Sequence, residues 1–246
     1  CESPEDIEAY EAEREKNRTL WEQKAQSDPA ALENAVVRAI IGDRELHKSQ
    51  RVVLSSLRAG NSVLAVMATG RGKSLTFQVH AACEALAHHT ASLFVHPLRA
   101  LIADQAFHIN EALAPFGINA CTLTGESAPD ERRQAFAGLA DGSVDIVLTT
   151  PEFLVCHAPE FAATGRIGFV VVDEAHHIGL SRAGHRPAYA QLGSAIAQMG
   201  NPVVLALTAT SDEAVTSDID RVLPVAGHVV DDTMRTNLHV VDQRNL

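Results

Sequence analysis

Six short apolar runs recur between residues 63 and 207, separated by stretches of helical length that are rich in Ala, Leu and Gln. The runs are Val63–Met67, Ala91–Val95, Ile118–Leu123, Asp145–Leu148, Phe169–Val172 and Val203–Leu207. A run that is apolar without alternation predicts a strand covered on both faces. Alternation of such strands with helices predicts a doubly wound, mostly parallel sheet of an α/β protein. Ligands of such sheets bind beyond the carboxyl ends of the strands, so the residues after each run are the candidates for a site.

The segment that precedes the first run has a different composition. Residues 2 to about 31 are rich in Glu, Lys, Arg, Gln and Ala, which predicts one solvated helix. Ser27-Asp28-Pro29 is expected to end that helix. A second helix is expected from about Pro29 to Ile41, with Asp28 as its N-cap. We therefore predict a helical extension or linker at residues 1–43 and one α/β domain at residues 44–246.

Composition weighs against several classes of protein. The chain has 20 Lys and Arg against 31 Asp and Glu, a net charge of −11, so any contact with nucleic acid needs a local surface. No apolar run approaches the ~20 residues of a membrane span, and no membrane partner is expected. The four cysteines are scattered without a C-x-x-C pair, which argues against a zinc site and a disulfide scaffold. Because the chain starts at Cys1 rather than Met, we expect a piece of a longer protein.

The loop after the first run is Ala68-Thr69-Gly70-Arg71-Gly72-Lys73-Ser74, and a helix is expected directly after it. Its glycines let the backbone wrap a phosphate, with successive N–H groups turned inward. Lys73 then places a cation at the β- and γ-phosphates, and the Ser74 hydroxyl can ligate Mg²⁺. The strict P-loop pattern needs a glycine where Met67 stands. Arg71, a long cation between two glycines, either adds to phosphate affinity or points to solvent.

Two carboxylates follow the fifth run, in Asp173-Glu174-Ala175-His176. A carboxylate at a strand end opposite a phosphate loop is placed to help hold a nucleotide-bound Mg²⁺. The neighbouring Glu174 can polarise the water that attacks the γ-phosphate. Adjacent carboxylates are common on any surface, but their position after an apolar strand and downstream of Lys73 and Ser74 favours the functional interpretation.

Further stretches in the same order resemble the first RecA-like domain of superfamily 2 helicases, and within them the RecQ-like DNA helicases. That family begins the phosphate loop in the form A-x-x-G-x-G-K-[ST], which Ala68 to Ser74 match. The other similar stretches are Gln50 as the adenine-reading glutamine, His96-Pro97-Leu98-Arg99-Ala100-Leu101 with Asp104-Gln105, Thr149-Thr150-Pro151-Glu152, Leu207-Thr208-Ala209-Thr210 and Arg235-Thr236-Asn237-Leu238. The resemblance covers about residues 44–246 and implies a RecA-like P-loop NTPase fold.

The resemblance implies ATP and Mg²⁺ as cofactors and gives each matching residue a role. The implied catalytic residues are Lys73, Asp173, Glu174 and His176. The implied nucleotide-binding residues are Gln50, Thr69, Gly70, Arg71, Gly72, Lys73 and Ser74, with Ser74 and Asp173 at Mg²⁺. Thr208 and Thr210 would couple hydrolysis to closure against a second RecA-like lobe. The implied DNA-binding residues are Pro97, Arg99, Thr149, Pro151, Arg182, His185 and Arg186.

The chain departs from the family in two places. The loop at residues 177–187 lacks the Trp and Phe of the family, whose stacking on bases is worth about 1–3 kcal/mol per base. DNA is then expected to act through Arg182, His185 and Arg186, unless these polar residues form a solvated loop. Near Gln50, Leu46 or no residue takes the place of the family's aromatic residue, so weaker selectivity for adenine is expected.

The implied function is the nucleotide-binding lobe of an ATP-dependent DNA helicase or translocase. It would act on single-stranded or partly duplex DNA in repair or recombination, in the cytoplasm, as in the cytosol or nucleoid of a bacterium. The second lobe, which carries the arginine finger, would follow Leu246, so residues 1–246 alone are expected to hydrolyse ATP weakly. Two alternatives remain open: a non-catalytic helicase-like scaffold within a larger repair or nuclease protein, and an RNA-directed superfamily 2 helicase.

Overall fold

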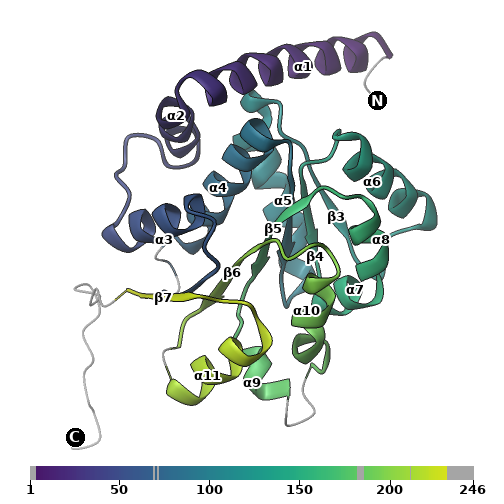
Figure 1. Cartoon of the computed structure of the whole chain (residues 1–246). Helices are drawn as coiled ribbons and strands as arrows, with labels where there is room; N and C mark the ends of the chain where they lie inside the picture. Colours follow the sequence, from purple (N-terminus) through teal and green to yellow (C-terminus); the bar gives the residue numbers. More distant parts are fainter. Residues whose placement is uncertain (1–3, 69, 71, 182–185, 211, 232–246) are drawn as a thin grey trace, which may run out of the picture.

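The computed structural model describes residues 4–68, 70, 72–181, 186–210 and 212–231. In this part of the chain, seven strands form one sheet in the order β3-β4-β2-β5-β6-β1-β7 (Figure 1), and every neighbouring pair is parallel. The strands are β1 (Val63–Val66), β2 (Ala91–Val95), β3 (Ala120–Leu123), β4 (Ile146–Thr149), β5 (Ile167–Val172), β6 (Val203–Thr208) and β7 (Gly227–Val230). All six predicted strands are present, and the described sheet is parallel throughout rather than mostly parallel.

Helices cover both faces of the sheet. The helices after the N-terminal pair are α3 (Lys48–Arg58), α4 (Lys73–His88), α5 (Arg99–Leu113), α6 (Pro129–Asp141), α7 (Pro151–Cys156), α8 (Ala158–Ala163), α9 (His177–Ser181), α10 (Ala188–Ala197) and α11 (Glu213–Val222), with a short 3-10 helix η1 (Ala114–Phe116). One apolar core lies under α3, α4 and α5, and a second lies under α6 to α11. Strand β1 is apolar at every position because both of its faces are buried. Val63 and Ala65 belong to the first core, whereas Leu64 and Val66 belong to the second.

Strand β7 has no counterpart among the predicted runs. It pairs with β1 at the edge of the sheet, with Gly227 opposite Val63 and Val230 opposite Val66. Its residues alternate between half-buried and exposed, as expected for a strand at an edge. A four-residue strand with one covered face carries too few apolar residues to stand out as a run.

The N-terminal residues form two helices, α1 (Pro4–Ser27) and α2 (Pro29–Ile41). The predicted break between them is confirmed, because the Asp28 side chain accepts a hydrogen bond from the Ala31 N–H at 3.0 Å and Pro29 is the first helical residue. Leu32 and Val36 of α2 are fully buried and belong to the first core. The predicted domain boundary between residues 43 and 44 stays a prediction.

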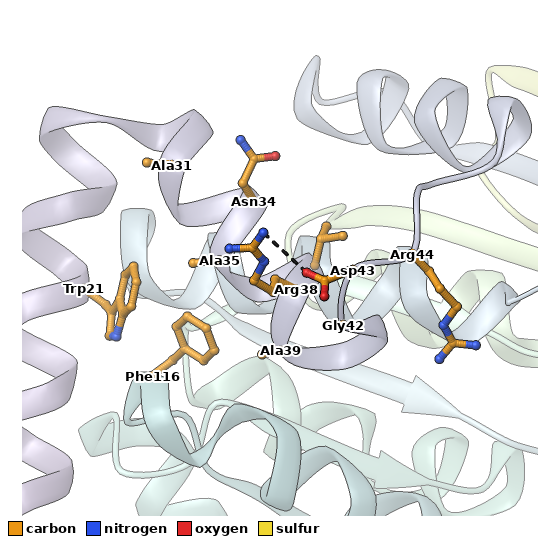
Figure 2. A pocket seen from close by; sticks show the side chains of 11 residues that line it. Trp21, Ala31, Asn34, Ala35, Arg38, Ala39, Gly42, Asp43, Arg44 and Phe116 are labelled. Carbon is orange, nitrogen blue, oxygen red and sulfur yellow. Dashed lines mark ion pairs between the residues drawn. The ribbon is translucent and has the colours of Figure 1, made fainter.

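The prediction of a solvated helix was wrong for one face of α1. The Trp21 and Phe116 rings lie 4.9 Å apart, between α1 and η1 (Figure 2). The Arg18 guanidinium forms an ion pair with Asp145, whose side chain is 0% exposed. The sequence did not indicate this packing because the buried positions are few and widely spaced among charged residues.

Helix α1 lies along the amino-terminal edge of the sheet. The Arg14 guanidinium donates to the carbonyls of Gly117 and Ser143, in the segments before β3 and β4. The Gln26 amide donates to the carbonyl of Ala87, in the last turn of α4 before β2. No helix in the described part of the chain is both long enough and apolar enough to cross a membrane.

Candidate active site

The four central strands place their following loops together. Strands β2, β5, β6 and β1 are neighbours in that order and run parallel, so the segments after them meet at one edge of the sheet. The loop before α4 follows β1, Pro97 follows β2, Asp173 to His176 follow β5, and Ala209 and Thr210 follow β6. Most of the predicted nucleotide and catalytic residues therefore lie at the carboxyl edge, as the topology requires.

The phosphate loop is shaped by a left-handed residue at the start of α4. Gly72 has φ 71° and is the N-cap of that helix, so Lys73 begins the first helical turn. The Gln50 side-chain amide donates to the Gly72 carbonyl at 3.0 Å, and the Gln50 Oε1 accepts from the His47 N–H at 2.8 Å. Gln50 thus holds the loop, in addition to its predicted role at adenine. Thr69 and Arg71 lie outside the described residues, and their predicted contacts stay predictions.

Gly72→Ala is expected to weaken ATP binding by about 10- to 100-fold, because the loop must shift by a fraction of an ångström or more. A Cβ at residue 72 would lie 2.5 Å from Gln50 Nε2, and the positive φ disfavours any L side chain. Titration with a fluorescent ATP analogue measures the loss. Gly60→Ala is the matched control, because Gly60 has φ 76° and nothing within 4 Å of the added Cβ. Equal affinities of the two variants would contradict the role given to the Gly72 backbone.

Lys73 points to the acidic loop across the edge of the sheet. Its Nζ lies 3.6 Å from Glu174 Oε1, and its side chain is 12% exposed. The Nζ atom has no hydrogen-bond partner among the described residues. A buried ammonium with unused donors is placed to receive an anion, and phosphate oxygens fit this requirement. Ser74 follows in the first turn of α4 and is exposed.

The Asp173 carboxylate is held at both oxygens. Its Oδ1 accepts the Glu174 backbone N–H at 2.9 Å, and its Oδ2 lies 3.2 Å from His96 Nδ1. Burial raises the pKa of the Asp173 carboxyl, but the hydrogen bond and charge of His96, with the charge of Lys73, outweigh burial and leave that pKa below its usual value. The predicted site residues did not include His96, although it stands directly before Pro97 in the sequence.

Glu174 has a strained backbone, and its two carboxylate oxygens face different side chains. Its φ is 49°, in the left-handed region that few non-glycine residues adopt. His176 Nδ1 lies 3.2 Å from Glu174 Oε2, on the side away from Lys73, which approaches Oε1. Strain of this kind concentrates at functional sites because the surrounding structure must enforce it.

The two threonines predicted for coupling lie at the end of β6. The Thr208 and Thr210 hydroxyl oxygens are 3.2 Å apart, and the Thr210 N–H donates to Thr208 Oγ1 at 3.3 Å. The Ala175 N–H donates to the Leu207 carbonyl at 2.8 Å, so the acidic loop is tied to the same strand end. The pair is therefore connected to the site through the backbone, while its coupling role stays a prediction.

The residues predicted to contact DNA are partly engaged in the protein. The Arg186 Nη1 donates to the Pro97 carbonyl at 2.6 Å, and Arg99 pairs with Glu126 at 2.7 Å on the surface. The buried Thr149 hydroxyl donates to the Leu123 carbonyl at 2.6 Å, and Pro151 is the buried first residue of α7. Arg182 and His185 are outside the part that the structure describes. Contact with DNA stays a prediction for all seven residues.

The family of this chain is shown by its sequence. The model of the DEAD/DEAH box helicase family matches residues 47–218, which include the phosphate loop, the acidic loop and the threonine pair. The chain belongs to the DEAD/DEAH box helicase family. The predicted RecA-like α/β fold is confirmed with it, since the parallel sheet carries the family's motifs at its carboxyl edge.

This helicase domain is similar to RecQ proteins over most of its length. ATP-dependent DNA helicase RecQ of Haemophilus influenzae is 33% identical over 196 residues, which cover 78% of this chain and 30% of the relative. ATP-dependent DNA helicase Q-like 2 of Arabidopsis thaliana is 31% identical over 197 residues, 76% of this chain and 26% of the relative. The chain thus spans less than a third of the length of these relatives.

A solved structure shares the fold of the helicase domain. The crystal structure of DUF1998 helicase MrfA bound to DNA superposes with a TM-score of 0.67 at 21% identity, covering 80% of this chain and 29% of that chain. At this identity the likeness supports the fold alone.

The residues of the helicase domain fit a magnesium nucleotide. Gly70 and Gly72 with positive φ, a buried Lys73 ammonium with unused donors and a carboxylate with a lowered pKa meet at one edge. One carboxylate and one hydroxyl suit Mg²⁺, which takes its remaining ligands from phosphates and water.

A cavity between α1, α2 and η1 is separate from this site (Figure 2). None of its lining residues belongs to the carboxyl edge, and the Arg38–Asp43 ion pair lies at its wall.

Proposed function

We propose that the chain is the nucleotide-binding lobe of a RecQ-like ATP-dependent DNA helicase. ATP hydrolysis would drive its movement along, or the unwinding of, single-stranded or partly duplex DNA in repair or recombination. The observation that carries the proposal is the approach of Lys73 Nζ to Glu174 Oε1, 3.6 Å apart, beside an Asp173 carboxylate held at both oxygens. A cytosolic or nucleoid location stays a prediction that follows from the proposed substrate.

In the proposed reaction, the side chains at the carboxyl edge divide the chemistry among them. Lys73 and the backbone around Gly72 bind the β- and γ-phosphates, while Ser74 and Asp173 hold Mg²⁺. The metal, when bound, neutralises charge that develops on the phosphate oxygens. Glu174 accepts a proton from the attacking water while the water oxygen forms a bond to the γ-phosphorus. The bond between the γ-phosphorus and the β–γ bridging oxygen breaks, and ADP leaves with that oxygen. His176 Nδ1 lies 3.2 Å from Glu174 Oε2 without forming a hydrogen bond to it, and His176 is proposed to act beside that carboxylate.

Movement on DNA requires a second lobe of the same protein. Domain closure around a nucleotide is a common way to convert binding into motion. Thr208 and Thr210 are proposed to transmit this closure, because the backbone of the acidic loop is bonded to the same strand end. Pro97, Arg99 and Arg186 are proposed to grip the DNA backbone without reading its sequence, while the buried Thr149 and Pro151 are proposed to support the loop after β4.

Lys73→Ala is expected to lower ATP turnover by about 10²- to 10³-fold, because a cation placed at the phosphates is lost. Steady-state phosphate release measures this in the full-length protein, with and without single-stranded DNA. Lys24→Ala is the matched control, since Lys24 lies on α1 in an exposed ion pair with Asp28.

Three outcomes of this experiment, the last with single-stranded RNA added in place of DNA, would contradict the proposal. Equal turnover of the wild type and Lys73→Ala would show that this site does not hydrolyse ATP. Turnover that single-stranded DNA never stimulates would favour the scaffold alternative. Stimulation by single-stranded RNA, but not by DNA of equal length, would favour the RNA-directed alternative.

A further inference from the structure

His96 is a buried polar residue beside the proposed metal ligand. It follows β2 directly, and its side chain is 2% exposed. Its Nδ1 atom lies 3.2 Å from Asp173 Oδ2. An ionised carboxylate only accepts hydrogen bonds, so Nδ1 carries the hydrogen of this contact. The imidazole therefore donates to Asp173.

The position of His96 is fixed by the sheet. Its backbone N–H donates to the Thr149 carbonyl at 2.9 Å, which continues the pairing of β2 with β4. On the other side, the Asp173 N–H donates to the Val95 carbonyl at 2.9 Å, which continues the pairing of β2 with β5. The histidine and the aspartate thus extend two adjacent, hydrogen-bonded strands, and their separation is set by backbone geometry.

Packing alone does not account for a histidine here. The ring contacts Phe77, with centroids 6.3 Å apart. Its second nitrogen, Nε2, is buried and has no hydrogen-bond partner among the described residues. Burial of an unpartnered polar atom is unfavourable, so an apolar ring would fill this space at lower cost. The one polar contact that the imidazole makes through its side chain, within the described structure, is the contact with Asp173.

Restraint at both oxygens defines the orientation of the Asp173 carboxylate. The Glu174 N–H holds Oδ1 and His96 holds Oδ2, so rotation about the terminal side-chain bond would break one contact or the other. Groups that orient a ligating carboxylate change metal affinity without touching the metal. The histidine lies where such a group is required.

We propose that His96 is a positioning residue that orients Asp173 for the Mg²⁺ of bound ATP. The inference rests on the proposed function, because it assumes that the site binds a magnesium nucleotide. His96 acts through Asp173 and touches neither phosphate nor water in this proposal.

The test compares nucleotide binding with and without the metal. The affinity of the chain for a fluorescent ATP analogue is measured in EDTA and across a Mg²⁺ titration. His96→Phe keeps an aromatic ring but removes the donor, and is expected to lower the apparent Mg²⁺ affinity by about 10- to 100-fold. Its affinity in EDTA is expected to stay within about two-fold of wild type, because Lys73 and the phosphate loop are unchanged. His96→Asn, which retains a side-chain N–H donor, is expected to recover most of the Mg²⁺ affinity.

A second buried histidine provides the matched control. His80 is 3% exposed in the same core, with its ring 4.6 Å from Phe169, and it lies in α4 two turns beyond Lys73. His80→Phe makes the same change of side chain away from Asp173 and is expected to leave the Mg²⁺ titration unchanged. Thermal unfolding of each variant identifies any that does not fold, and His96→Asn still tests the donor if His96→Phe is unfolded.

Three results would overturn the inference. Wild-type Mg²⁺ affinity in His96→Phe would show that the donor is not needed. Equal losses in EDTA and in Mg²⁺, not recovered by His96→Asn, would assign His96 to packing. A wild-type chain that binds the analogue equally with and without Mg²⁺ would refute both this inference and the proposed metal site. A loss of Mg²⁺ affinity in His96→Phe, with His80→Phe unchanged, leaves the proposed function standing.

Discussion

Glu174→Gln is expected to slow ATP hydrolysis by about 10²- to 10⁴-fold while ATP binding is retained, because a positioned general base contributes that much. The amide has nearly the size of the carboxylate but cannot accept the proton of the attacking water. Lys73 Nζ, 3.6 Å from Oε1, remains free to bind phosphates. Single-turnover hydrolysis with saturating single-stranded DNA measures the rate, and an equilibrium titration measures the affinity separately.

The control for this experiment is Glu111→Gln. Glu111 is exposed on α5 and pairs with His108, and its substitution removes the same charge far from the phosphate loop. An unchanged rate in Glu174→Gln would exclude Glu174 as the base. An equal loss of rate and affinity would instead place Glu174 in nucleotide binding through its contact with Lys73.

Arg18→Ala is expected to destabilise the fold by about 3–5 kcal/mol, the usual result of removing one partner of a buried ion pair. Arg18 Nη1 donates to both oxygens of Asp145 at 3.0 and 2.9 Å, and the Asp145 side chain is fully buried. After the substitution, the Asn119 N–H at 3.0 Å is the hydrogen-bond donor left to that carboxylate among the described residues. Urea unfolding, followed by far-ultraviolet circular dichroism, measures the change in the free energy of unfolding.

Two further variants separate the buried pair from a general effect of charge. Arg38→Ala removes an arginine from an exposed pair with Asp43 and is expected to have little effect on stability. In Arg18→Met with Asp145→Asn, the buried charges are removed together while an acceptor for Asn119 remains, so most of the stability should return. If Arg18→Ala and Arg38→Ala change the free energy of unfolding equally, the Arg18–Asp145 pair contributes no more to stability than an exposed ion pair.

The sequence was most informative where many apolar residues repeat. Six strands could be predicted because burial on both faces removes polar residues from a whole run, as in β1. Strand β7 has one covered face and four residues, and the packed face of α1 rests on a few positions such as Arg18 and Trp21. These features depend on partners that are distant in the chain, which local periodicity does not reveal.

The candidate site could be predicted at the level of its loops but not of its contacts. The order of the strands brings Lys73 to Glu174 and the loop after β2 to Asp173, and motif spacing indicated which loops matter. Motif spacing did not indicate that His96 forms a hydrogen bond with Asp173, 77 residues away. Nor did it indicate that the Gln50 side chain donates a hydrogen bond to the Gly72 carbonyl. The first contact follows from the register of β2 with β5 and the second from the packing of α3 beside the phosphate loop, and both appear only in three dimensions.

The position of α1 has a practical consequence for experiments on this protein. Its contacts with Gly117, Ser143 and Asp145 hold it against the segments that precede the strands, opposite the edge where the phosphate loop lies. Leu20 is exposed on this helix. A dye or surface anchor attached there would be separated from the phosphate loop by the length of the strands, and an immobilised molecule would present the carboxyl edge of its sheet to the solution.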